Sequence, residues 1–227
     1  MKAVIFDLFE TLVSFSFEEY NKVLASMADQ LEKIPEMFIS SWHRDWPNHE
    51  KGVFKNLADY IVAVSGPALS VSALREAVGI HKVFQKQTLI PNPQTITILK
   101  SLKNAGYKIG LITNCPIETP ALWEESPLSA LVDVAVFSTV ERTRKPDPTL
   151  FLSCAQRLEC SPDECIYVGD GANQELSAAS AVGMYAIGLC KDNEEGHGKH
   201  WSGTTVSNLS ELILQIEKIE TPSHPLS

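Results

Sequence analysis

The sequence of 227 residues predicts a doubly wound α/β protein, in which a parallel sheet has helices on both faces and a helical insert follows the first strand. Three observations predict this fold. Short apolar runs recur along the chain, and each ends at polar or glycine-bearing residues. Helical patterns lie between these runs. One long stretch, residues 14–90, holds helical patterns alone.

Five apolar runs are expected to be strands, because each is short and continuous, as in strands buried on both faces of a parallel sheet. They lie at residues 3–6, 108–112, 132–137, 165–168 and 184–189. Strands that alternate with helices predict a parallel sheet. The carboxyl ends of such strands meet at one edge, where these folds place their ligands.

Four segments between or after these strands have the apolar spacing of helices, at residues 95–105, 148–158, 173–182 and 208–219. The first is followed by Gly106 and the third by Gly183, and glycine commonly ends a helix. The second begins with Asp147 as N-cap and Pro148 at the first helical position.

The stretch from 14 to 90 departs from this alternation. It contains four helical patterns, at residues 18–33, 35–46, 53–64 and 71–87. Consecutive helices without intervening strands indicate a separate helical unit. We therefore expect an α/β catalytic core of residues 1–13 and 91–227 and a helical cap of residues 14–90. A cap inserted after the first strand would cover the ligand edge of the sheet.

The composition excludes several classes of protein. Nineteen Lys and Arg against 28 Asp and Glu give a formal net charge of −9, which argues against nucleic acid or membrane partners. The five cysteines include no CxxC pair, as expected for reduced thiols rather than a disulfide framework or thiolate zinc site. Asp7 interrupts an apolar start too short for a signal peptide. We expect a cytoplasmic monomer or homodimer.

Residues suited to metal and phosphate chemistry follow four of the strands. Asp7 follows the first strand, Thr113 the second and Asp170 the fourth, and Lys145 lies in the segment after the third. Two carboxylates and a lysine suit a divalent cation and a phosphoryl group. One carboxylate is then free to act as a nucleophile.

Four motifs in this order resemble the haloacid dehalogenase-like (HAD) superfamily. They are FDLFETL at residues 6–12, LITN at 111–114, KPDP at 145–148, and VGDGANQE at 168–175, which continues to AVGM at 181–184. The resemblance covers nearly the whole chain. It implies a Rossmann-like core, a helical cap after the first strand (subfamily I), and a magnesium-dependent hydrolase of a small phosphorylated metabolite.

The resemblance also implies roles for single residues. Asp7 would be the nucleophile and would form an aspartyl-phosphate. Thr113 and the backbone N–H of Asn114 would bind the phosphoryl oxygens, with Lys145 as both a catalytic and a phosphate-binding residue. Lys145 would also keep Asp7 ionised.

Magnesium would be held by Asp7, Asp170 and the backbone carbonyl of Phe9. Its preference for oxygen ligands matches this set. Many relatives have Asp where this chain has Glu175. The Glu175 carboxylate would hold Asp170 or Lys145 in position without binding the metal itself.

Phe9 is the main departure from the family pattern. Phosphatases of the family usually carry a second aspartate there, as the general acid/base. Such a group contributes about 10²–10⁴-fold to the rate, so we expect slow turnover. Glu10 is a weak substitute, because adjacent side chains seldom point the same way.

Two alternatives stay open. One is a 2-haloacid dehalogenase-type or phosphonate-cleaving hydrolase that uses Asp7. The other is a non-catalytic module that binds a phosphorylated ligand. The fourth motif of the metal-free dehalogenases looks different from Gly169-Asp170, and this favours phosphate chemistry.

Several other polar and aromatic residues carry weaker expectations. Trp42 is expected to be a packing anchor, while His43 or Arg44 could contact substrate. Arg144, beside Lys145, is expected to be a solvated surface residue. A second metal site at His197 and His200 is disfavoured by their spacing.

Overall fold

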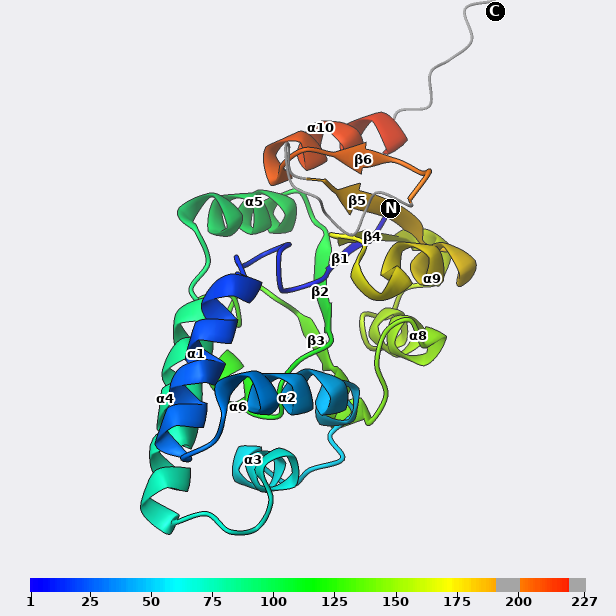
Figure 1. Cartoon of the computed structure of the whole chain (residues 1–227). Helices are drawn as coiled ribbons and strands as arrows, with labels where there is room; N and C mark the ends of the chain where they lie inside the picture. Colours follow the sequence, from blue (N-terminus) through cyan, green and yellow to red (C-terminus); the bar gives the residue numbers. More distant parts are fainter. Residues whose placement is uncertain (191–200, 221–227) are drawn as a thin grey trace, which may run out of the picture.

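In the computed structural model, which describes residues 1–190 and 201–220, six strands form one sheet in the order β3-β2-β1-β4-β5-β6 (Figure 1). Every neighbouring pair is parallel. The strands are β1 (Ala3–Phe6), β2 (Lys108–Thr113), β3 (Val134–Phe137), β4 (Cys165–Gly169), β5 (Tyr185–Leu189) and β6 (Thr205–Val206). The predicted α/β parallel sheet is confirmed.

Helices cover both faces of this sheet. Helices α5 (Pro93–Asn104) and α10 (Leu209–Glu220) pack on one face, and α8 (Pro148–Arg157) and α9 (Glu175–Ala181) on the other (Figure 1). Along β1, Val4 and Phe6 belong to the first of these two cores, and Ala3 and Ile5 to the second. Both faces of β1 are therefore buried, which is why its run has no polar position.

Four helices follow β1 before the chain returns to the sheet at α5. They are α1 (Phe17–Gln30), α2 (Pro35–Glu50), α3 (Leu57–Ser65) and α4 (Val71–Thr88), called the helical segment below (Figure 1). They pack around a hydrophobic cluster of their own, centred on Tyr20, Leu24, Trp42 and Tyr60. The parts of the chain just before and just after the segment are joined, because Thr95 Oγ1 in α5 donates a hydrogen bond to the Leu12 carbonyl at 3.2 Å.

Some element boundaries differ from the prediction. Helix α3 begins at Leu57 rather than 53, because the Asn56 side chain caps it by accepting a hydrogen bond from Asp59 N at 2.9 Å. Helix α2 continues to Glu50 instead of ending at 46. Strand β6 and the short helices α6 (Thr119–Trp123) and α7 (Ser138–Glu141) had not been predicted, because such short elements show no periodicity.

The helix predicted over 173–182 is wrong at its beginning. Residues Ala172–Gln174 form a 3₁₀ turn in which Asn173 and Gln174 are left-handed, with φ of 53° and 56°. Helix α9 therefore starts at Glu175. Within the residues that the structure describes, no helix is long and apolar enough to cross a lipid bilayer.

Candidate active site

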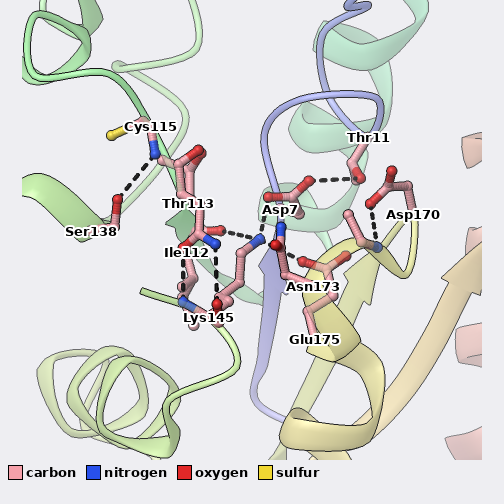
Figure 2. Close-up of polar contacts among 12 residues, drawn as sticks. Asp7, Thr11, Ile112, Thr113, Cys115, Ser138, Lys145, Asp170, Asn173 and Glu175 are labelled. Atoms are coloured by element: carbon pink, nitrogen blue, oxygen red, sulfur yellow. Dashed lines mark hydrogen bonds and ion pairs between the residues drawn. The ribbon is translucent and has the colours of Figure 1, made fainter. Parts of the chain in front are cut away.

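The carboxyl edge of the sheet brings the predicted residues together. Asp7 directly follows β1, which has β2 on one side and β4 on the other. The Asp7 N–H donates to the Val168 carbonyl at 2.9 Å and so holds the residue at the end of β4. Asn114 follows β2 and Asp170 follows β4. Figure 2 shows Asp7, Lys145, Asp170 and Glu175 converging at this edge.

Lys145 is the buried cation of the site. Its Nζ donates to Asp7 Oδ1 and, at 2.5 Å, to Glu175 Oε2 (Figure 2). Burial acts to lower the pKa of Lys145, but the two carboxylates outweigh it and the pKa lies above its usual value. The side chain therefore stays charged at neutral pH.

Asp7 is a buried carboxylate that lies near two other carboxylates, so its surroundings disfavour its charged form. Burial raises the pKa of its carboxyl above the usual value; the charge of Lys145 opposes this rise, and the carboxylates of Glu175 and Asp170 reinforce it. Three carboxylates thus share one ammonium. A second cation would relieve this excess of negative charge.

The donor set fits magnesium as that second cation. One carboxylate oxygen from each of Asp7, Asp170 and Glu175 lies within 4.8 Å of the others. Both oxygens of Glu175 already accept protein hydrogen bonds, from Lys145 and Gly171 N among others. Glu175 is also fully buried and absent from the lining of the cavity described below, whereas Asp7 and Asp170 line it. These two side chains are therefore best placed to hold a metal ion, and oxygen ligands are those that magnesium prefers.

Neighbouring groups fix the position of Lys145. Its backbone N–H donates to Asn114 Oδ1 at 2.8 Å, and Asn114 Nδ2 donates back to the Lys145 carbonyl at 3.3 Å. The Lys145 ammonium also donates to the Tyr167 hydroxyl oxygen at 3.2 Å, and that hydroxyl donates to Glu175 Oε2 at 2.7 Å. A Cβ atom at Gly169 would collide with Glu175 Oε1, so glycine leaves the room that glutamate needs.

Two threonines differ from expectation. Thr113 is fully buried, its hydroxyl donates to the Asn114 carbonyl at 3.3 Å, and it is absent from the lining of the described cavity. Thr11, to which the sequence analysis gave no role, donates from Oγ1 to Asp7 Oδ2 at 3.4 Å (Figure 2). The position of Thr11 in the first motif, four residues after Asp7, is the sequence feature from which this contact could have been predicted.

A cavity of about 270 Å³ lies between the site and the helical segment. Asp7, Asn114, Lys145 and Asp170 line it, together with five aromatic side chains that we call the aromatic wall: Phe9, Phe15, Phe17, Tyr20 and Trp46. Phe15 joins this wall, because its ring centroid lies 5.7 Å from Phe9, 5.1 Å from Phe17 and 5.4 Å from Tyr20.

The position of Arg144 differs from the prediction that it is a solvated surface residue. It is not a solvated residue: it lines the cavity, its Nε lies 2.8 Å from Glu50 Oε2, and its NH2 group donates to Asn173 Oδ1 at 2.7 Å. Glu50 comes from α2, so this ion pair connects the helical segment to the catalytic edge. Sequence reasoning missed it because the two residues are far apart in the chain.

The remaining candidates are placed as follows. Trp42 is fully buried, as predicted for a packing anchor. His43 lines the cavity and bonds to Asn21 Oδ1 at 2.8 Å, whereas Arg44 bonds to Ser41 and is not part of the lining.

Glu10 also lines the cavity, but its Oε1 accepts a hydrogen bond from Phe15 N. His197 and His200 lie outside the described residues.

The carboxyl edge of this open parallel sheet holds the Asp7 carboxylate, a buried lysine and an acidic cluster, where the sequence motifs place them. Residues 1–183 match the family model of the haloacid dehalogenase-like hydrolases. The chain therefore belongs to this family and is a hydrolase.

Two curated relatives extend over nearly the whole chain. The β-phosphoglucomutase of Bacillus subtilis is 29% identical over 230 residues, covering 95% of this chain and 93% of the relative. The glyceraldehyde 3-phosphate phosphatase of Methanocaldococcus jannaschii is 26% identical over 221 residues, covering 94% and 96%.

Solved structures share the fold. The 2-haloacid dehalogenase of Pseudomonas syringae has a TM-score of 0.71 at 21% identity, over 96% of this chain and 99% of that one. A HAD family enzyme of Bacteroides thetaiotaomicron, solved with magnesium and inorganic phosphate, has a TM-score of 0.66 at 16% identity, over 89% and 97%.

Proposed function

We propose that this protein hydrolyses a small phosphorylated metabolite, with magnesium, through an aspartyl-phosphate on Asp7. The observation that carries the proposal is the contact of the Lys145 ammonium with Asp7, beside an Asp170 carboxylate within 4.8 Å. A nucleophile, a fixed positive charge and a second metal-binding carboxylate are the parts that phosphoryl transfer requires.

In the first step an Asp7 oxygen attacks phosphorus. The bond from phosphorus to the leaving oxygen breaks, and its electron pair stays on that oxygen, which takes a proton from water to become the alcohol. Water then attacks phosphorus and gives a proton to the solvent, the bond from phosphorus to Asp7 breaks, phosphate leaves, and the Asp7 carboxylate is restored. Lys145 stabilises the negative charge that develops on the phosphoryl oxygens. Magnesium, when held by Asp7, Asp170 and the Phe9 carbonyl, would supply further charge stabilisation.

The names of the relatives support a small phosphorylated substrate, since they include a phosphoglucomutase and a sugar-phosphate phosphatase. The helical segment contributes Phe17, Tyr20 and Trp46 to the cavity, and the connection before it contributes Phe15, which supports the assignment of this part of the chain as a cap. A cap over the reacting groups would exclude water and select the leaving group. The assignment of residues 14–90 to the cap and of the rest to the core is part of this proposal.

Phe9 supports a second candidate, displacement of halide from a 2-haloacid by Asp7. In that reaction Asp7 attacks carbon and halide departs without needing a proton, so no acid is required at position 9. Asp170 does not separate the two reactions, because the ester left on Asp7 must be hydrolysed by water and a neighbouring carboxylate can take the proton of that water.

The test compares phosphate release from 4-nitrophenyl phosphate and a panel of sugar phosphates with chloride release from 2-chloropropionate. Both are measured with magnesium, with EDTA, and in Asp7→Asn. Phosphate release that requires both magnesium and Asp7 supports the proposal. Chloride release that requires Asp7 alone would replace it with the second candidate, and binding of phosphate without turnover would indicate a ligand-binding module.

A further inference from the structure

One buried amide in the cavity lining has no hydrogen-bond partner. Gln85, on α4, is 1% exposed and lines the cavity. Its Oε1 makes no hydrogen bond to any residue that the structure describes. A buried polar group without a partner is costly, so it is expected to find one in what fills the cavity.

The neighbouring polar groups on the buried face of α4 all contact other protein groups, and the second ring nitrogen of His81 contacts Glu118. One turn earlier, His81 Nε2 lies 2.9 Å from the Tyr20 hydroxyl. One turn later, the Thr88 hydroxyl donates to the Phe84 carbonyl at 3.0 Å. Gln85 therefore differs from its neighbours in facing the cavity with an unused hydrogen-bonding group.

The rest of the cavity offers apolar faces and little free positive charge. The Arg144 guanidinium is already paired with Glu50 at 2.8 Å, and Lys145 is held by Asp7 and Glu175. Burial lowers the pKa of His43, which keeps its ring neutral at pH 7. A second anionic group on the substrate would meet no uncommitted cation among the described lining residues.

We infer that Gln85 is a specificity-determining residue, which hydrogen-bonds a hydroxyl on the uncharged, ring-bearing leaving group of a phosphomonoester. The inference rests on the proposed function and names its substrate class. The aromatic wall would pack against the ring. A hydroxyl group both donates and accepts, so it satisfies the Gln85 amide in either orientation.

The experiment compares benzyl phosphate with its 2-, 3- and 4-hydroxymethyl counterparts, in which the added hydroxyl is not conjugated with the benzylic carbon. Acetyl phosphate serves as a minimal substrate and phosphoglycolate as an anionic one. For the wild type we expect one hydroxylated isomer to exceed benzyl phosphate in kcat/KM by about tenfold or more, and phosphoglycolate to be the poorest ester. In Gln85→Leu the ratio of hydroxylated to plain substrate should fall to about one, through a rise in KM.

The matched control is Gln87→Leu, the same substitution at an exposed position of α4. It should keep the preference of the wild type. The melting temperature of Gln85→Leu should equal or exceed that of the wild type, because leucine replaces an unpaired buried amide. If the leucine variant misfolds, Gln85→Met makes the same comparison.

The inference is overturned if no isomer is preferred, or if the preference survives in Gln85→Leu, while acetyl phosphate is still hydrolysed in an Asp7-dependent way. Failure of the proposed function has a different signature, since acetyl phosphate would then not be hydrolysed at all. In that case calorimetric binding of the corresponding benzylphosphonates to wild type and Gln85→Leu decides the role of Gln85.

Discussion

The Lys145 ammonium lies 2.5 Å from Glu175 Oε2 and also contacts Asp7, so one buried cation joins two buried carboxylates. Removing this cation in Lys145→Met leaves both anions without their counter-charge. We expect the free energy of unfolding to fall by about 3–5 kcal/mol and phosphate release to be lost. Urea unfolding and a phosphate assay measure the two effects.

The double variant Lys145→Met with Glu175→Gln is the control for this prediction. It removes one buried charge of each sign, so most of the lost stability should return while activity stays absent. If Lys145→Met alone is as stable as the wild type, the two carboxylates do not depend on Lys145 for compensation.

Phe9→Asp restores a carboxyl group where phosphatases of the family usually have one. We expect faster hydrolysis of alkyl phosphates, by up to about 10²–10⁴-fold, because a general acid protonates a poor leaving group. The gain should be small for 4-nitrophenyl phosphate, whose leaving group needs no proton. Phe9→Asn removes the ring without supplying an acid, and equal rates for the two variants would contradict this account.

Asp170→Asn should weaken magnesium binding. Asparagine keeps an oxygen that accepts the hydrogen bond from Ala172 N, at 3.0 Å in the wild type, but it loses the charge that holds the ion. Calorimetry should show magnesium affinity reduced by about tenfold or more. Asp163→Asn, at an exposed position outside the cluster, should bind magnesium like the wild type. Unchanged affinity in Asp170→Asn would remove this residue from the ligand set.

His49 makes the stability of the protein dependent on pH. Burial lowers its pKa from 6.5 to about 4; Glu118 opposes this change and His81 adds to it. The unfolded chain therefore takes up the proton first. Stability is complete above about pH 6.5 and falls as the pH drops toward 4, by about 3 kcal/mol from this residue.

His49→Gln tests this dependence, because glutamine does not titrate and still offers an acceptor to Ile117 N. Urea unfolding at pH 7 and pH 4.5 should show a smaller loss of stability in the variant than in the wild type. His43→Gln, at an exposed position, should retain most of the wild-type loss, because burial lowers the pKa of that ring to a smaller extent. The prediction is wrong if the His49 and His43 variants behave alike.

Much of the fold and of the catalytic edge could be predicted from the sequence. Continuous apolar runs identify strands buried on both faces, and parallel pairing then places Asp7, Asn114 and Asp170 at one edge. The direction of a single side chain does not follow from such patterns. Thr113 has the expected position, but its hydroxyl donates to the Asn114 carbonyl, whereas Thr11 contacts Asp7.

The cavity lining was largely unpredictable for a different reason. Gln85 is one polar residue among many in an amphipathic helix, and its role depends on how α4 packs over the sheet edge. The Glu50–Arg144 pair likewise depends on contacts between distant parts of the chain. The start of α9 at Glu175 depends on left-handed Asn173 and Gln174, a conformation that non-glycine residues seldom adopt.

The hydrogen bond between Thr95 and Leu12 means that the chain leaves the sheet and returns to it at almost the same place. The whole helical segment can therefore be excised or exchanged without stretching β1 away from α5. The hydrolytic groups would stay with the sheet, while Gln85, Tyr20 and Trp46 would travel with the graft. From the inferred role of Gln85, we expect a chimaera that carries this segment on another sheet of the same fold to inherit its choice of leaving group.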